Sequence, residues 1–313
     1  MIISASRRTD IPAFYWDWFC GRLQEGYVDV VNPFNRKQVS RISLQLGCVD
    51  CIVFWTKDPT RMLENLEVLR AYPCYVQVSL TPYDTDVEGN IRPKEDIVRA
   101  MQELSRRWGR ERVVWRYDPI LVNEDYTSER HFAWFAQTLA KLAPYSERCV
   151  ISFIDLYAKT KKNTQGLKLH ELSEAEMREI AAGLADLAKG SGVALQTCSE
   201  AIDLADYGIG HGACLDGALI ERITGKPLKK NKAKSQRPLC NCVESFDIGQ
   251  YETCIPGCRY CYANYNEESV RRAVAQHDPR SPLLVGQVQP GDVIRAARQE
   301  SWRDGQLTLA ELL

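Results

Sequence analysis

The chain has 313 residues, 45% of them hydrophobic, which is enough for one large domain or two smaller ones. Its 40 Lys and Arg residues balance 41 Asp and Glu residues, whereas proteins that hold nucleic acid over a broad surface are usually basic. No run of about 18 apolar residues occurs, which argues against a membrane span, and the start MIISASRRTD lacks the features of a signal peptide. We therefore expect a cytoplasmic protein with no membrane partner, in which any nucleic-acid contact is local.

Short β-branched and aromatic runs alternate along the chain with amphipathic segments. Strands are expected at residues 1–6, 51–56, 74–80, 112–118, 149–155 and 193–198. Helices are expected near residues 12–25, 59–71, 94–107, 128–142 and 173–189. The strands are continuous apolar runs, as in sheets that are buried on both faces. The alternation predicts an α/β fold of parallel β/α units, with a small hairpin inserted at residues 27–44.

The pattern changes near residue 199, where the segments become shorter and glycine is frequent. A basic stretch, KPLKKNKAKSQR, follows and is either a solvated loop or a patch for an anionic partner. Prolines after residue 278 mark a tail that we expect to wrap around the domain and end in a short helix. The expected division is β/α units at 1–198, a cysteine-rich region at 199–277 and a C-terminal tail at 278–313.

Polar side chains follow the expected strands, at the end where parallel β/α folds gather their chemistry. These residues include Thr9, Asp10, Lys57, Ser79, Arg116 and Asp118. Asp10 also suits the N-cap of the helix that follows it. Arg116 either anchors a carboxylate or phosphate of a substrate or forms a salt bridge with Asp118.

Three of the twelve cysteines lie close together, as Cys254, Cys258 and Cys261 in the segment ETCIPGCRYCYAN. The cytosol keeps thiols reduced, so clustered cysteines there are more often metal ligands than disulfides. Structural zinc takes four protein ligands, and a 4Fe–4S cluster normally takes four thiolates. A loop that supplies only three leaves one metal corner open for another ligand, which favours a chemical role over a structural one.

The spacing C-x3-C-x-aromatic-C, with Tyr260 before the third cysteine, resembles the signature of the radical S-adenosylmethionine (SAM) enzymes. In that superfamily three cysteines hold a 4Fe–4S cluster, and the amino and carboxylate groups of SAM bind the fourth iron. An electron from the cluster cleaves SAM, and the resulting 5′-deoxyadenosyl radical removes hydrogen from a substrate. The resemblance implies that Tyr260 packs beside the cofactor and that a flavodoxin or ferredoxin supplies the electron. The whole chain also resembles the DUF1848 family, most closely in DIGQYETCIPGCRYCYAN.

Radical SAM enzymes carry this loop after the first barrel strand, whereas here it follows nearly all the β/α units. A circular permutation reconciles the two: a strand within 242–249 becomes the usual first strand, and Met1 begins the second. The motifs SRRTD, FWTKDP, VQVSLTPYD and WRYDPI resemble, in order, the strand ends of the spore photoproduct lyase branch. The resemblance therefore implies a circularly permuted partial (β/α) barrel and, by analogy of fold alone, a nucleotide or nucleic-acid substrate.

This resemblance also assigns roles to the polar residues at the strand ends. It implies that Thr9 and Asp10 lie near the SAM amino group and that Ser79 lies near the ribose. Lys57 is implied as the partner of the SAM carboxylate, and a flexible ammonium group suits that role. An ordinary surface lysine is the alternative for Lys57.

The remaining cysteines fall into two sets. An auxiliary 4Fe–4S cluster is the preferred interpretation of the first set, and structural zinc or unrelated buried thiols are the alternatives. This first set consists of Cys198, Cys214, Cys240 and Cys242. The second set is expected to be small buried hydrophobic residues of strands and helices, and it consists of Cys20, Cys48, Cys51, Cys74 and Cys149.

The sequence thus predicts a radical SAM enzyme that acts on an unknown substrate, with Arg116 and Asp118 beside the reacting groups. Two other classes stay open. One is a non-catalytic iron–sulfur protein that binds a nucleic acid or a protein partner. The other is a zinc-stabilised α/β protein with a basic binding loop.

Overall fold

The structure is a computed structural model that describes residues 1–229, 231–233, 237, 239–297 and 300–303. The basic stretch is therefore described only in part. The short helix expected at the end of the tail lies outside the described residues. No helix in the described ranges has both the length and the apolar character that crossing a membrane requires.

The described chain forms a main sheet of eight strands, every neighbouring pair of which is parallel. The order across the sheet is β10 (Phe246–Asp247), β1 (Ile2–Ala5), β4 (Cys51–Thr56), β5 (Cys74–Ser79), β6 (Val113–Ile120), β7 (Arg148–Phe153), β8 (Ala194–Thr197) and β9 (Gly210–His211). The expectation of parallel β/α units is therefore confirmed. Among the described residues no pairing joins β9 to β10, so the sheet is open rather than a closed barrel.

Strand β10 comes from late in the chain and lies at the edge of the main sheet beside β1. Ile3 pairs with Phe246 and Ser4 with Asp247, and Asp247 also accepts hydrogen bonds from the hydroxyls of Ser4 and Ser6 at 2.8 and 2.7 Å. The strand expected within 242–249 is therefore present, and it brings the cysteine loop that follows it next to the N-terminal strand.

Helices connect the strands, and their bounds are α1 (Ile11–Phe14), α2 (Trp16–Glu25), α3 (Thr60–Glu64), α4 (Lys94–Trp108), α5 (Ser128–Leu142), α6 (Ala158–Asn163), α7 (Glu174–Ala188), α8 (Gly217–Thr224) and α9 (Glu267–Val274). Three short 3₁₀ segments lie between these helices and the strands, as η1 (Leu66–Leu69), η2 (Arg110–Arg112) and η3 (Ala205–Tyr207). A capping box formed by Ser173 and Glu176 begins α7.

One expected helix, over residues 12–25, is divided in two at Tyr15. The Tyr15 backbone leaves the helical region, and its buried hydroxyl donates a 2.6 Å hydrogen bond to the carbonyl of Thr253. The contact joins this break to the residue just before Cys254. A tertiary contact therefore accompanies the interruption of a segment whose local pattern is helical.

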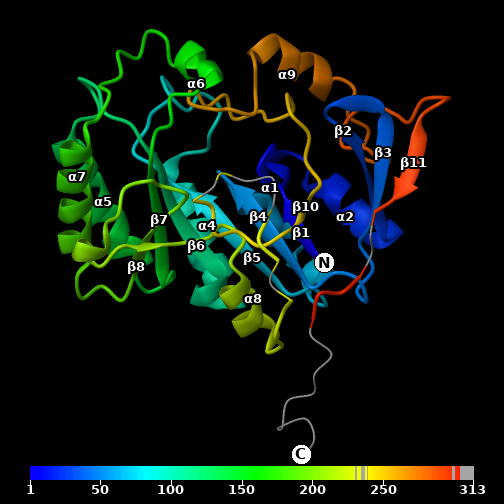
Figure 1. Ribbon diagram of the computed structural model, residues 1–313, viewed down its shortest axis with the longest axis horizontal. Coiled ribbons are helices and arrows are strands. Elements are labelled where there is room, and N and C mark those ends of the chain that lie inside the picture. The colour runs from blue at the N-terminus through cyan, green and yellow to red at the C-terminus, as the bar shows by residue number, and fades with distance from the viewer. Residues whose placement is uncertain (230, 234–236, 238, 298–299, 304–313) are drawn as a thin grey trace, which may run out of the picture.

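A second sheet contains β2 (Tyr27–Asn32), β3 (Asn35–Ser43) and β11 (Val293–Ala296), in the order β11-β3-β2. Strands β2 and β3 are antiparallel, which confirms the expected hairpin, and β11 from the tail pairs in parallel with β3. Figure 1 shows these three strands at the right of the view, beside the main sheet.

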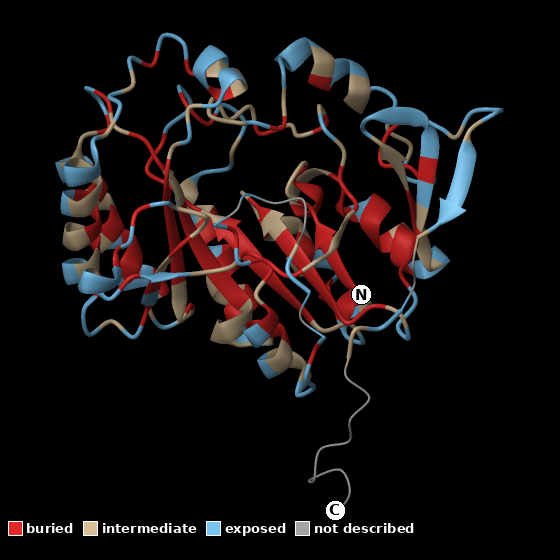
Figure 2. Cartoon of the chain, viewed as in Figure 1, coloured by how far each residue is buried: buried red, intermediate tan, exposed pale blue. Residues whose placement is uncertain are grey.

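The two faces of the main sheet are covered by different parts of the chain. One face, which includes Phe54 and Trp115, packs against α2, α4, α5 and α7. The other face, which includes Val53 and Tyr75, packs against residues between 213 and 243. Figure 2 shows the resulting band of buried strands between partly exposed helices. The cysteine-rich region therefore fills the face that the β/α helices leave uncovered.

Most cysteines of the second set lie in this core, as expected. Cys20, Cys51, Cys74 and Cys149 are buried. The exception is Cys48, which is only partly buried and lies in a turn between β3 and β4. The expectation that Cys48 belongs to a strand or helix is therefore wrong.

Candidate functional site

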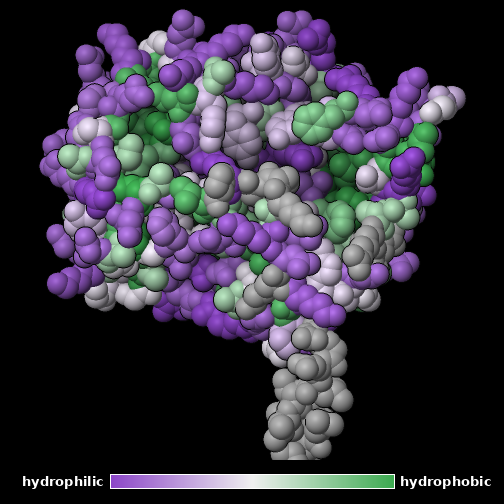
Figure 3. Space-filling view, in the orientation of Figure 1, coloured by the Kyte–Doolittle hydropathy of each residue, from purple (hydrophilic) through white to green (hydrophobic). Residues whose placement is uncertain are grey.

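A cavity of about 840 Å³ lies at the carboxyl ends of the main strands, a volume in the range of small-molecule sites. Every candidate cofactor, metal or catalytic residue of the sequence analysis lines it. These are Thr9, Asp10, Lys57, Ser79, Arg116, Asp118, Tyr260, Cys198, Cys214, Cys240, Cys242, Cys254, Cys258 and Cys261. Figure 3 shows that hydrophilic residues cover much of the molecular face in this view. Residues from both halves of the chain thus meet at one site.

Cys254, Cys258 and Cys261 lie on the loop after β10, and all three are free thiols of intermediate exposure. The loop turns sharply at Gly257, whose φ of +70° is a conformation that side chains other than glycine rarely adopt. The amide of Cys261 donates to the carbonyl of Cys258 at 3.1 Å and closes the second turn. This local geometry directs three thiols of one short segment towards a common space.

Two strand-end loops hold the cysteine loop in place. The Thr9 hydroxyl donates to the Gln250 carbonyl at 2.7 Å and also contacts the Thr253 hydroxyl. From the loop after β5, Glu88 forms an antiparallel bridge with Cys258, and the amide of Asn90 donates to the carbonyl of Pro256 at 2.9 Å. The Thr9 side chain is thus used in positioning this loop.

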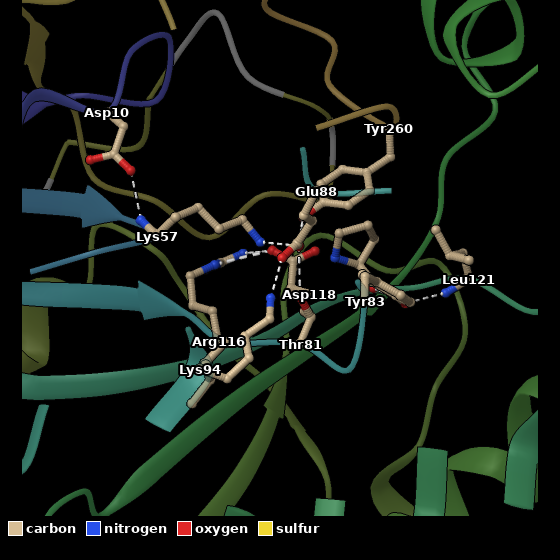
Figure 4. Close-up of polar contacts among 12 residues, drawn as sticks. Asp10, Lys57, Thr81, Tyr83, Glu88, Lys94, Arg116, Asp118, Leu121 and Tyr260 are labelled. Atoms are coloured by element: carbon tan, nitrogen blue, oxygen red, sulfur yellow. Dashed lines mark hydrogen bonds and ion pairs between the residues drawn. The ribbon is translucent and has the colours of Figure 1, made fainter. Parts of the chain in front are cut away.

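Glu88 is the centre of a buried polar cluster on this wall of the cavity. Its carboxylate accepts hydrogen bonds from Lys57 Nζ at 2.6 Å, from Lys94 Nζ at 2.5 Å and from the Thr81 hydroxyl at 2.7 Å. The Tyr260 hydroxyl also donates to it. Figure 4 shows these side chains converging on Glu88 from several different elements. Glu88 therefore joins the cysteine loop to the strand-end lysine.

The charged groups in this cluster shift one another's pKa values. Burial would raise the pKa of Glu88, but Lys57 and Lys94 outweigh burial and lower that pKa from 4.5 to about 2. Burial and the nearby charge of Lys57 lower the pKa of Lys94, although Glu88 opposes this shift. Burial would lower the pKa of Lys57, but Glu88 and other nearby negative groups outweigh burial and raise it. Glu88 thus interacts with two ammonium groups, and Asp118 adds negative charge near Lys57.

Asp10 links the ends of β1 and β4. Its carboxylate accepts from the amide of Ala13 at 3.0 Å, which caps α1, and from the amide of Lys57 at 2.7 Å. Burial raises its pKa to about 6, and the hydrogen bonds oppose that shift only in part. The N-cap interpretation is confirmed, and Asp10 also fixes the backbone of Lys57.

Arg116 and Asp118 form the salt bridge considered from the sequence. Arg116 Nε donates to Asp118 at 3.0 Å, and Nη2 contacts the same oxygen. Arg116 Nη1 donates to the Gln77 side chain at 2.9 Å and to the sulfur of Cys214 at 3.1 Å. Asp118 also accepts from Ser152. The pair therefore connects β6 to Cys214, one of the first set of cysteines.

Glu88 is a residue of the site that carried no signal in the sequence, whereas Arg237 and Ser79 lie in segments that the sequence singled out. Glu88 lies in a loop without a recognisable motif, and its role depends on partners distant along the chain. Arg237, within the basic stretch, lines the cavity and forms a 2.5 Å ion pair with Asp155. Ser79 ends β5 at the cavity wall, as expected from its place in the strand.

As placed in the structure, no group of three or more His, Cys, Asp or Glu side chains within the described ranges could hold a metal ion. A family model described as a domain of unknown function, DUF1848, matches residues 2–263. That range includes the main sheet, the three-cysteine loop and the first set of cysteines. No curated protein and no solved structure matches the chain. Because the DUF1848 model covers most of the chain, the protein belongs to the DUF1848 family.

Proposed function

We propose that this protein is a radical SAM enzyme in which Cys254, Cys258 and Cys261 hold a 4Fe–4S cluster with an open corner for SAM. When bound, the cluster supplies the electron that cleaves SAM and yields a 5′-deoxyadenosyl radical, which acts on a substrate held in the same cavity. One observation carries the proposal: three free thiols of one loop share a cavity with a lysine suited to a carboxylate.

The donor set fits the proposed cluster. Thiolates are the usual protein ligands of iron–sulfur clusters, and three on a short loop leave one position for a further ligand. All three thiols are unpaired and face a cavity of about 840 Å³, which is large enough for a cofactor and part of a substrate. Loading requires these thiols to become thiolates, so cluster binding releases protons.

The order of strands supports a circularly permuted partial (β/α) barrel of the radical SAM type. Strand β10 precedes the cysteine loop and lies beside β1, and β4, β5 and β6 then follow in order across the sheet. The cysteine loop is therefore next to the loops that begin at the ends of β1 and β4. This is the neighbourhood that a loop after the first barrel strand occupies.

Lys57 supplies a charged group for the SAM carboxylate. Its ammonium lies 2.6 Å from Glu88 and 5.3 Å from the ring centre of Tyr260, next to the loop that carries Cys258. Lys94 also pairs with Glu88, so this carboxylate stays compensated when Lys57 turns towards a ligand.

The other predicted residues support binding on neighbouring walls. The Asp10 carboxylate is an acceptor for an amino group, and Thr9 holds the cysteine loop rather than the ligand. Ser79 presents a hydroxyl suited to a ribose, since it lines the cavity at the end of β5. Arg116 and Asp118, held rigidly by each other, lie on the wall that we assign to the substrate.

The test is anaerobic incubation of the iron-reconstituted protein with dithionite, in place of its electron donor, and with SAM. We expect 5′-deoxyadenosine to form, to disappear in a Cys258→Ala variant and to persist in Cys48→Ser, which changes a cysteine remote from the cavity lining. If the reduced, reconstituted protein leaves SAM intact, the proposal is wrong.

A further inference from the structure

The four thiols of the first set meet in the cavity from three separate parts of the chain. Cys198 follows β8, Cys214 precedes α8, and Cys240 with Cys242 precedes β10. The sulfur atoms of Cys198 and Cys214 are 2.8 Å apart. Cys214, Cys240 and Cys242 belong to one buried cluster of the core. The four thiols thus form one continuous group.

Simple hydrophobic packing does not account for this group. Cys214, Cys240 and Cys242 are buried against the face of the sheet that holds Val53 and Tyr75, as isolated thiols often are. Yet all four sulfur residues also line the cavity. The buried cysteines of the second set, such as Cys74 and Cys149, do not line the cavity. The clustering therefore calls for a chemical reason.

Charged and polar groups around the four thiols suit thiolates. The buried guanidinium of Arg116 donates from Nη1 to the Cys214 sulfur at 3.1 Å. The backbone amide of Leu215 donates to the Cys242 sulfur at 3.4 Å. A buried thiolate needs such donors, because burying an uncompensated charge is costly. Hydrogen bonds to the sulfurs are also a usual feature of iron–sulfur sites.

We propose that Cys198, Cys214, Cys240 and Cys242 hold a second iron–sulfur cluster, in which the protein supplies every external ligand. Four thiolates are the complete set that a 4Fe–4S cluster takes. This site opens on the same cavity as the three-cysteine loop. A cluster that reaches the three-cysteine loop through this cavity can also reach these four cysteines. A shared cavity therefore favours an iron–sulfur cluster over a structural zinc ion.

Loading the site requires the thiols to rearrange. Two sulfur ligands of one zinc ion lie roughly 3.8 Å apart when each Zn–S bond is about 2.3 Å, and a cluster spreads them further. The 2.8 Å between the sulfurs of Cys198 and Cys214 is shorter than either. Binding therefore removes the thiol protons and separates these two sulfurs by rotation of their side chains.

The test is a measurement of iron, sulfide and zinc per chain in anaerobically reconstituted full-length protein. Wild type should hold roughly eight irons, and the Cys240→Ser/Cys242→Ser double variant roughly four, since each cluster contributes four. A Cys258→Ala variant should also hold roughly four, and Cys48→Ser, the matched control, roughly eight. If the double variant holds as much iron as wild type, the inference is wrong. It is also wrong if the double variant loses one equivalent of zinc and no iron.

The variants separate this inference from the proposed function. If Cys258→Ala loses iron but the double variant does not, only the second site fails. If the double variant loses iron but Cys258→Ala does not, the radical SAM proposal fails and the second site stands. Iron left at the three-cysteine loop reports that the double variant has folded. Should the double variant retain no iron at all, Cys198→Ala, at a partly exposed position, replaces it: a loss of roughly four irons supports the inference, and any other content overturns it.

Discussion

The ammonium group of Lys57 lies 2.6 Å from the carboxylate of Glu88, and the two residues follow neighbouring parallel strands. Glu88 in turn receives the hydroxyl of Tyr260 from the cysteine loop and the ammonium of Lys94 from the start of α4. The cofactor loop and the lysine that we assign to SAM are therefore positioned by one buried carboxylate. Four of the predictions that follow test this wall of the cavity.

Replacing Lys57 by methionine should weaken SAM binding by about 10- to 100-fold, because a hydrogen bond to a charged group contributes about 1.5–3 kcal/mol. Anaerobic equilibrium dialysis of the reconstituted protein with labelled SAM measures the change. Lys141→Met is the matched control, since Lys141 pairs with Glu95 between α5 and α4, away from the cavity lining. Equal affinity in the two variants would rule out Lys57 as the carboxylate partner.

Replacing Glu88 by glutamine should lower the free energy of unfolding by about 3–5 kcal/mol at neutral pH, since it removes the buried counter-charge of two partly buried lysines. Urea unfolding of the metal-free protein measures this loss. A Glu95→Gln variant, which removes an exposed ion pair, should cost less than about 1 kcal/mol. Comparable costs in the two variants would contradict the buried cluster.

The same carboxylate predicts a dependence of stability on pH. The pKa of Glu88 falls from 4.5 to about 2 on folding, so its contribution is fully present above about pH 4.5 and is lost as pH drops towards 2. The difference in unfolding free energy between wild type and Glu88→Gln should therefore shrink over this interval. A difference that stays constant between pH 6 and pH 2.5 would show that Glu88 does not hold its charge through these contacts.

Tyr260 should tolerate loss of its hydroxyl better than loss of its ring. Tyr260→Phe removes one donor from Glu88, which keeps Lys57, Lys94 and Thr81, so the cost should be about 1 kcal/mol. Tyr260→Ala also removes the ring packed near Lys57 and Tyr83, and it should destabilise the protein by about 3–5 kcal/mol. Thermal unfolding ranks the two variants, and the reverse order would contradict this account.

Gly257 should be required for the cysteine loop. An alanine there would have to adopt a φ near +70°, which costs about 1–2 kcal/mol in the left-handed region. Gly257→Ala should therefore retain less iron after reconstitution and gel filtration than wild type. Gly47→Ala is the control, because a Cβ at Gly47 meets nothing within 4 Å and its φ lies outside the left-handed range. Equal iron retention would show that this turn does not limit loading.

Six strands of the main sheet (β1, β4, β5, β6, β7 and β8) could be predicted closely, because continuous apolar runs mark strands that are buried on both faces, whereas the two-residue strand β9 was not predicted. The same reasoning placed the polar strand ends, such as Lys57 and Ser79, on one cavity, since parallel strands bring their carboxyl ends to one edge. Strand β11 could not be predicted, because its partner β3 lies far away in the sequence. The short helices α6, α8 and α9 also escaped prediction, since few turns give little periodic signal.

Within the candidate site, spacing alone revealed the cysteines but not the residues that hold them. Glu88 lies in an irregular loop, and nothing in its neighbourhood indicates that Lys57, Lys94 and Tyr260 will surround it. The salt bridge of Arg116 and Asp118 was one of two readings of their spacing, whereas the contact with Cys214 needed the tertiary structure. Long-range polar contacts of this kind depend on the packing of the whole fold.

The most direct test of the central claim is the electron paramagnetic resonance spectrum of the dithionite-reduced protein with and without SAM. The Cys240→Ser/Cys242→Ser variant is the sample of choice, so that only the cluster at Cys254, Cys258 and Cys261 contributes. We predict a signal from a reduced 4Fe–4S cluster whose g-values shift when SAM binds its open iron. A cluster signal that SAM leaves unchanged, or no cluster signal at all, would contradict the account.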